Sequence, residues 1–124
     1  MISNSKIVAF VATKNAAGAK IFYENVLGLI LVSDDAFALV FDANGTMLRV
    51  QKVKELNPAP YTALGWDVAD IDAEVDELAG RGVVFNRYSW FPQDERGIWT
   101  APSGGRIAWF NDPDGNTLSL TQFH

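Results

Sequence analysis

Short stretches of alternating hydrophobic and polar residues make up most of this chain, and two amphipathic stretches of helical spacing interrupt them. The clearest alternation lies in residues 105–122, around the turn Asp112–Gly115. Proline presets φ in such a turn, aspartate bonds its own backbone, and glycine accepts a positive φ. Leu118 and Leu120 fall on one face of the second strand, and Ser119 falls on the other. This pattern predicts a closing hairpin with one apolar face and one polar face.

The first half of the chain predicts a strand, a helix and three further strands. Residues 7–13 are apolar and β-branched, and Asn15 is a candidate N-cap for a helix that ends at Gly28. Three short strands are predicted after this helix, at residues 29–33, 37–42 and 46–52. We therefore expect a first βαβββ module at residues 6–54.

The pattern restarts after a proline-rich linker at residues 55–60. A strand is predicted at 61–69, followed by a helix that Asp70 caps. Further strands are predicted at residues 83–86 and 98–101, ahead of the closing hairpin. The result is a second βαβββ module at residues 61–123.

The second module is longer than the first. Asp70 follows Asn15 by 55 positions, whereas Asp112 follows Asp42 by 70, so about fifteen extra residues lie between the second helix and its hairpin. They fall in residues 86–97 and 102–105. A long loop in a compact domain is often functional, and the aromatic side chains of residues 86–97 indicate a segment that packs.

Three motifs carry a resemblance to a known family: Phe22-Tyr23 with Leu27-Gly28-Leu29, Ala69-Asp70-Ile71, and Asp112–Asn116. With these motifs the chain resembles, over residues 6–122, the vicinal oxygen chelate superfamily of glyoxalase I, extradiol dioxygenases and the bleomycin and fosfomycin resistance proteins. The resemblance implies an α+β fold in which two paired βαβββ modules form a curled mixed sheet around a cavity. Residues 1–124 would then be a single domain, and a homodimer is expected because a second chain usually closes this fold.

Charge and composition narrow the possible partners. The net charge is −5, the sequence pI is about 4.6, and the ten basic residues are scattered, so we expect no nucleic-acid partner. The chain has no cysteine, which excludes disulfides and thiolate metal sites. No apolar run approaches the ~18 residues of a membrane span, so we expect no membrane partner and a cytoplasmic location.

The resembled family places metal ligands at four inward positions, two in each module. Carried over to this sequence, these positions hold Val8, Arg49, Ala63 and Ser119. Two of these side chains cannot coordinate a metal, one is a cation and one is a weak neutral donor. The single histidine is His124, at the end of the chain. We therefore expect no metal and no cofactor.

Strand alternation predicts which residues face the cavity and which lie beneath the helices. The cavity-facing set is Phe10, Arg49, Gln51, Asp67, Trp109, Thr117, Ser119 and Thr121, and the helix-facing set is Leu64, Trp66, Val68, Phe110, Leu118 and Leu120. Trp90, Phe91 and Trp99 lie close to Trp109 in the sequence. Aromatic walls with a few polar anchors are typical of a small-molecule pocket.

These residues predict a metal-independent protein of the bleomycin-resistance type that binds a small organic ligand, with sequestration of an antibiotic as one role. The ligand would contact Phe10, Arg49, Gln51, Asp67, Trp90, Phe91, Trp99, Trp109 and Ser119. One alternative is a lyase, isomerase or dioxygenase relative that acts on a small carbonyl or aromatic substrate. Another is a protein whose modules form an interaction surface. Arg49 is either a ligand anchor or the partner of an internal carboxylate.

Overall fold

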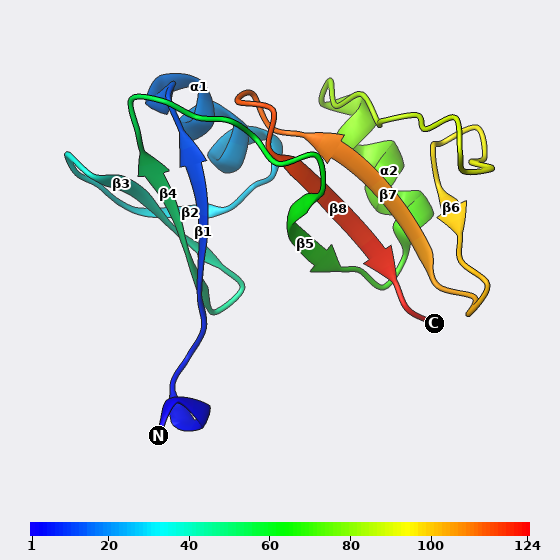
Figure 1. Cartoon of the computed structure of the whole chain (residues 1–124), viewed down its shortest axis with the longest axis horizontal. Coiled ribbons are helices and arrows are strands. Elements are labelled where there is room, and N and C mark those ends of the chain that lie inside the picture. Colours follow the sequence, from blue (N-terminus) through cyan, green and yellow to red (C-terminus); the bar gives the residue numbers. More distant parts are fainter. The chain divides into compact units, whose positions relative to one another are not determined.

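The computed structural model describes all residues from Met1 to His124, and the chain divides into two compact units, Met1–Asn57 and Pro58–His124 (Figure 1). Each unit contains one four-stranded mixed sheet and one helical segment. None of the helices combines the length and apolar character that crossing a membrane requires.

The first unit is a βαβββ module preceded by a short helical turn. Its elements are η1 (Ile2–Asn4), β1 (Val8–Thr13), α1 (Ala16–Ile21), η2 (Phe22–Val26), β2 (Ile30–Asp34), β3 (Ala38–Ala43) and β4 (Thr46–Lys52). The strand order is β1-β4-β3-β2; β1 runs parallel to β4, and the other pairs are antiparallel. All the elements predicted for this half of the chain are confirmed.

The helix of the first unit begins and ends as its sequence predicts, with a wider last turn. The side chain of Asn15 accepts a hydrogen bond from the backbone N–H of Gly18 at 3.1 Å, which satisfies a free donor of the first turn. At the other end, α1 continues into the π-helical turn η2, where the N–H of Leu27 bonds the carbonyl of Phe22. Gly28 follows at φ +76°, a conformation that glycine adopts without strain.

The core of the first unit lies between this helix and one face of its sheet. Tyr23 is fully buried and packs against Phe41 of β3, with ring centroids 5.9 Å apart. Leu48 and Val50 of β4 are buried on the same sheet, while Arg49 between them points to the opposite face.

The second unit repeats the βαβββ pattern. Its elements are β5 (Thr62–Asp67), α2 (Ile71–Gly80), β6 (Trp99–Thr100), β7 (Arg106–Asn111) and β8 (Thr117–Gln122), and the strand order is β5-β8-β7-β6. Strand β5 runs parallel to β8. The carboxylate of Asp70 caps α2 by accepting from the N–H of Ala73 at 3.2 Å. The closing hairpin β7–β8 is confirmed in full.

The predicted strand at residues 83–86 is wrong. The only backbone bond that these residues make to the sheet runs from Asn86 N–H to the carbonyl of Trp109, at 2.8 Å. Strand β6 pairs with Arg106 and Ile107 at one end of β7, and residues 83–86 meet the rest of this edge only through Asn86, so they form no strand. β6 confirms the strand predicted at 98–101 and is two residues long.

The apolar face of the second sheet packs against α2. The side chains of Ile71, Val75 and Leu78 are buried on one side of the helix. In the sheet, Phe110 lies opposite Leu118, and both are fully buried. The same side of the sheet carries the other residues predicted to lie beneath the helix: Leu64 lies opposite Leu118, and Trp66 lies opposite Leu120.

Candidate functional site

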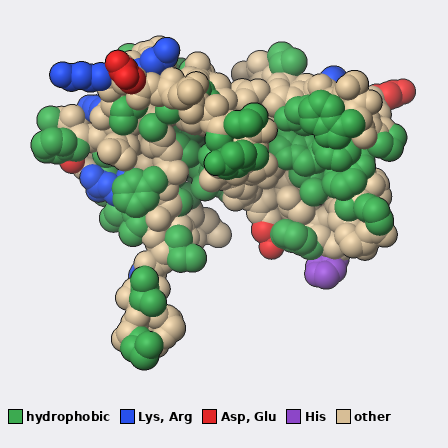
Figure 2. Space-filling model, in the orientation of Figure 1, with side chains coloured by type: hydrophobic (Ala, Val, Ile, Leu, Met, Phe, Trp, Pro, Cys, Tyr) green, Lys and Arg blue, Asp and Glu red, His purple; other side chains and the backbone are tan.

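The face of the second sheet that points away from α2 combines aromatic and small polar side chains; we call it the open face of the second sheet. Strand register arranges it in three rows: Trp99, Ile107, Thr121 and Asp67; Trp109, Ser119 and Gly65; and Asn111, Thr117 and Thr62. Figure 2 shows hydrophobic side chains gathered over β7 and toward β6 of this unit. The face has an aromatic side at β6–β7 and a small, polar side at β8–β5.

The centre of this face is recessed because Gly65 has no side chain. A Cβ at Gly65 would lie 2.6 Å from the hydroxyl oxygen of Ser119, so Ser119 uses the space that Gly65 leaves open. Ser119 and its neighbour Thr117 are both buried. These small residues form a polar floor beside the ring of Trp109.

Trp109 is held in place by a residue that the sequence analysis did not include. A β-bulge between Thr62 and Leu64 puts Thr62 opposite Thr117 and leaves Ala63 without a cross-strand partner. The indole N–H of Trp109 donates to the hydroxyl of Thr62 at 3.2 Å. Strict alternation places Ala63 inward, and nothing in the sequence around Thr62 marks the bulge that breaks it.

Five aromatic side chains form a cluster on this face: Tyr88, Trp90, Phe91, Trp99 and Trp109. The ring of Phe91 lies parallel to Trp109, with an interplanar angle of 3° and centroids 5.4 Å apart. It also stacks on Trp99 at 4.5 Å. Tyr88 meets Trp109 edge to face at 5.5 Å. The structure therefore brings the predicted residues Trp90, Phe91, Trp99 and Trp109 together.

The insertion that carries Phe91, residues 86–97, is fixed by one glutamine. Gln93 accepts a hydrogen bond from the N–H of Tyr88 at 2.7 Å and donates to the carbonyls of Asn86 and Gly97 at 2.9 and 2.8 Å. Arg87 also donates to two backbone carbonyls, those of Asp94 and Glu95. Gln93 was not among the predicted site residues, although it is the one amide side chain between Phe91 and β6.

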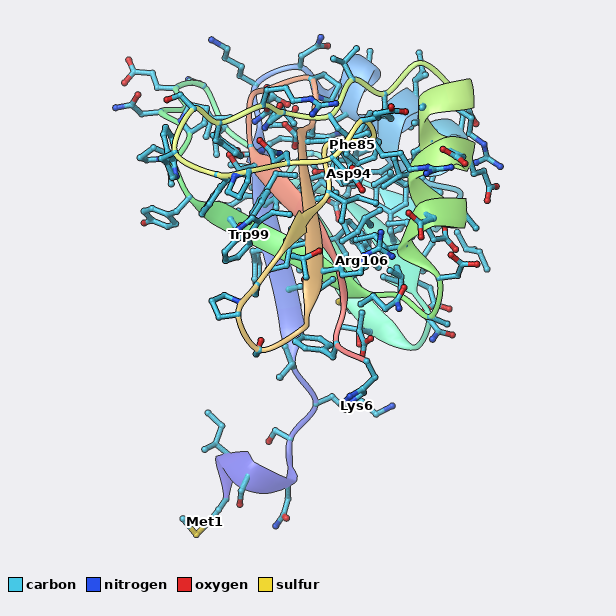
Figure 3. All side chains as sticks on the ribbon, turned by 90° about the vertical axis from the view of Figure 1, so that its right-hand side faces the viewer. Met1, Lys6, Phe85, Asp94, Trp99 and Arg106 are labelled. Atoms are coloured by element: carbon cyan, nitrogen blue, oxygen red, sulfur yellow. The ribbon has the colours of Figure 1, made fainter.

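Ion pairs tie the insertion and β7 to α2 on the other side of the sheet. Arg96 of the insertion donates to both carboxylate oxygens of Asp76, at 2.8 and 3.0 Å. Arg106 of β7 does the same to Asp72, at 2.8 and 2.9 Å, and lies 3.8 Å from Asp94 (Figure 3). The paired guanidinium groups hold the pKa of the Asp72 and Asp76 carboxyls below the usual value. These groups are already paired and lie away from the open face.

The first sheet has its own open face, which carries Phe10, Arg49 and Gln51. Arg49 lies between Phe10 of β1 and Val40 of β3. Its side chain is half-buried and makes no ion pair or hydrogen bond, whereas Lys52 on the same strand pairs with Asp34 at 2.6 Å. Arg49 therefore has no close ion pair, and its charge acts on Asp35 only at longer range.

An apolar pocket of about 390 Å³ lies at one end of the first sheet. Val8 lines it, and its other lining residues are Lys6, Ile7, Val32, Val40, Phe41, Asp42, Gly45 and Met47. Val8 occupies a position at which the resembled family places a metal ligand. An isopropyl group there cannot coordinate a metal.

The donor groups of the chain do not fit a metal centre. No group of three or more His, Asp or Glu side chains is arranged to hold a metal ion. Of the four positions taken from the resembled family, Val8 and Ala63 are apolar, Arg49 is a cation, and Ser119 lies beside Gly65 and Trp109. His124 is exposed at the end of the chain.

The predicted site residues fall into two sets, one in each unit. Phe10, Arg49 and Gln51 belong to the first sheet, and Asp67, Trp90, Phe91, Trp99, Trp109 and Ser119 belong to the second unit. In the second set, the aromatic residues and Ser119 are in contact or on adjacent strands. Asp67 lies at the β5 end of the row that holds Trp99, and it makes no ion pair or hydrogen bond.

Comparison with known proteins supports this description of the fold. A sequence model of the Glyoxalase/Bleomycin resistance protein/Dioxygenase superfamily matches residues 6–120. No curated protein sequence matches the chain.

Solved structures share the architecture at low sequence identity. A member of the same superfamily from Sphaerobacter thermophilus is 26% identical, with 94% of this chain and 96% of that chain covered and a TM-score of 0.72. A glyoxalase family protein from Bacillus anthracis is 17% identical, with 96% and 94% covered and a TM-score of 0.75. A bleomycin-binding protein complexed with bleomycin is 21% identical, with 96% and 98% covered and a TM-score of 0.75. The α+β fold with two βαβββ modules is thereby confirmed.

Proposed function

Because the chain belongs to the glyoxalase/bleomycin resistance protein/dioxygenase superfamily, we propose that it binds a small organic ligand on the open face of the second sheet, without a metal. Membership of this superfamily alone does not select between binding and catalysis, since its fold supports both. The choice between binding and catalysis therefore depends on the side chains of the open face and on whether the chain has side chains that could coordinate a metal.

The observation that carries the proposal is the pairing of an aromatic wall with a small polar floor. Trp99 and Trp109, with Phe91 stacked on both, form the wall, and the hydroxyl-bearing residues Ser119, Thr117 and Thr121 lie beside it in the sheet. Small-molecule sites typically combine predominantly apolar walls with a few fixed polar groups. The hydrogen bond from Trp109 to Thr62 holds the ring in one orientation, which lowers the entropic cost of binding.

The side chains at the four family positions suit a protein that sequesters its ligand better than an enzyme that uses a metal. A metal-dependent enzyme of this fold needs several anionic or imidazole ligands that converge, and Val8 and Ala63 supply none. One structural neighbour of this chain is a bleomycin-binding protein. We therefore propose that the protein holds its ligand rather than transforming it, and an antibiotic is one class of ligand to test.

An enzyme that needs no metal is the second candidate, and Asp67 is the observation that favours it. Its carboxylate is exposed on the row that holds Trp99 and Thr121, and it has no ion-pair partner. A general base must reach the proton that it removes. In this candidate function Asp67 would remove a proton from a small carbonyl or aromatic substrate, and Asp67→Asn would abolish turnover while ligand binding persists.

The test of the proposed function is a thermal-shift screen of chelator-treated protein with small aromatic and carbonyl compounds, bleomycin included, followed by calorimetry on the hits. We expect Trp109→Ala to weaken binding of a hit at least tenfold, since it removes a stacking surface and its burial. The matched control is Trp66→Ala, on the helix-facing side of the same sheet. It should lower the free energy of unfolding by about 2 kcal/mol and leave the affinity unchanged.

Two outcomes would contradict the proposal. If binding of the organic compound required an added divalent metal, the protein would have a metal site, contrary to the chemistry of Val8 and Ala63. Binding that survives Trp109→Ala in folded protein would place the ligand elsewhere.

A further inference from the structure

Phe91 occupies the position on the aromatic wall that a flat ligand would take. Its ring is parallel to Trp109 within 3° and stacks on Trp99 at 29°, with centroids 5.4 and 4.5 Å apart. Trp99 and Trp109 lie side by side, 6.2 Å apart, on neighbouring strands. They form a two-ring platform on the sheet, and Phe91 covers it from a loop.

The part of the insertion that carries Phe91 is the part that the structure holds least. In residues 89–91 the backbone makes one hydrogen bond, from the N–H of Phe91 to the carbonyl of Tyr88, at 3.3 Å, and the pairing of the insertion with β6 begins beyond it, at the bridge between Gln93 and Trp99. Trp90 beside it is 71% exposed. The residues on both sides are fixed, because Gln93 makes three bonds to the insertion's own backbone and Arg96 pairs with Asp76 of α2.

This distribution of bonds separates the tip of the insertion from its base. Moving Phe91 off the platform breaks its stacking on Trp99 and Trp109, its edge contact with Tyr88 and one long hydrogen bond, and it leaves the bonds of Gln93 and Arg96 intact. Segments with few backbone hydrogen bonds and little burial open at the lowest free-energy cost. A planar ring that replaces Phe91 recovers the same offset stacking on Trp99 and Trp109.

We propose that the platform of Trp99 and Trp109 is a binding site for a planar aromatic ring, and that Phe91 is its displaceable occupant. This inference rests on the proposed function and specifies its ligand as a flat aromatic compound. Phe91 then sets selectivity, because a ligand ring must stack better than a phenyl group to displace it. Competition lowers the apparent affinity of the intact protein by the fraction of molecules in which the platform is free.

The test compares Phe91→Ala and Phe91→Leu with the wild type, using 2-naphthoate as the probe and isothermal calorimetry as the measurement. Both variants remove the competing ring, and Phe91→Leu keeps apolar bulk at the tip. We expect each to bind 2-naphthoate about tenfold more tightly than the wild type, given the strength of stacked ring pairs. The control is Val84→Ala, which shortens an exposed apolar side chain of the same unit outside the aromatic cluster; its affinity should equal that of the wild type.

Hydrogen exchange of the wild-type protein gives an independent readout. Binding of 2-naphthoate should speed exchange of the Phe91 amide, because the tip leaves the platform, and it should leave exchange at Tyr88, which Gln93 holds, unchanged. Slower exchange at the tip would show instead that the loop closes over the ligand, and it would overturn the proposal.

Two further results of the calorimetry would also overturn the proposal. Affinity that falls or stays constant in both Phe91 variants overturns the displacement of Phe91, and failure of both variants to bind 2-naphthoate overturns the ring site. The proposed function fails separately, if no hit of the wider screen depends on Trp109.

Discussion

At the scale of single residues, the question is whether Arg49 has a structural role or a ligand-binding role. A half-buried guanidinium is usually paired, yet Arg49 has neither an ion pair nor a hydrogen bond, and it lies between Phe10 and Val40 on its sheet. The sequence alone leaves both roles open. Within the first unit no carboxylate lies within ion-pair distance of Arg49, and its attraction to Asp35 acts over a longer range, so the geometry favours the binding role.

We predict that Arg49→Gln changes the free energy of unfolding by less than about 0.5 kcal/mol, as for substitutions that break no specific contact. The same change should weaken binding of an anionic hit from the ligand screen and leave a neutral hit unaffected. Chemical denaturation and calorimetry measure the two effects, with Lys54→Gln, which removes an exposed charge of the same unit, as the control. A stability loss of ~2 kcal/mol or more would show that Arg49 has a partner after all.

At the scale of elements, strands β5 and β8 fit together because Gly65 lacks a side chain. Gly65→Ala places a methyl group 2.6 Å from the hydroxyl oxygen of Ser119, closer than atoms can pack, so we predict a loss of about 1–3 kcal/mol in stability. Ser119→Ala removes that oxygen, and the next neighbouring atom is then at 3.5 Å.

The double variant Gly65→Ala, Ser119→Ala should therefore regain most of the lost stability. Thermal denaturation of the four proteins forms a double-mutant cycle. Additive losses in this cycle would show that the two residues do not share the space.

The Asp72–Arg106 ion pair joins helix α2 to strand β7. Because Asp72 can be protonated, this pair makes the stability of the fold depend on pH in the acidic range. Arg106 lowers the pKa of Asp72 from its ordinary 3.8. The folded protein therefore binds this proton less readily than the unfolded chain does, so the pair stabilises the fold above about pH 3.8 and is lost as the pH falls through the folded pKa.

We predict that Asp72→Asn lowers the melting temperature at neutral pH and reduces its further decline below pH 3.8. The control Glu74→Gln, on the same helix but without a side-chain partner, should keep the wild-type acid profile. An unchanged acid profile in Asp72→Asn would contradict the assignment. The measurement is the melting temperature across a series of acidic buffers.

The elements that sequence reasoning predicted correctly are those set by local chemistry. Asn15 and Asp70 cap their helices, and alternation separates Trp109 from Phe110. The bulge at Ala63 and the absence of a strand at residues 83–86 depend on how strands pair across the sheet. The local sequence carries no sign of this pairing. The same holds for the candidate site: nearby aromatic residues predicted a cluster, but the parallel stacking of Phe91 depends on the bonds of Gln93.

At the scale of the whole molecule, the open face of the first sheet bears on the state of assembly. It exposes apolar side chains, among them Phe10, Val8 and Met47, and β1 and β2 are the edge strands of the sheet. Edge strands and apolar patches favour association. We predict a homodimer, measured by light scattering at tens of micromolar protein; a monomeric mass across moderate salt would contradict this.

The central claim is that a small organic ligand binds on the open face of the second sheet without a metal. The most direct test follows the four tryptophan indole N–H signals by NMR while a hit from the screen is titrated in the presence of chelator. We predict that the signals of Trp99 and Trp109 shift with the ligand, while Trp66 on the helix-facing side stays unchanged. Shifts confined to Trp66, or shifts that appear only after a divalent metal is added, would contradict the account.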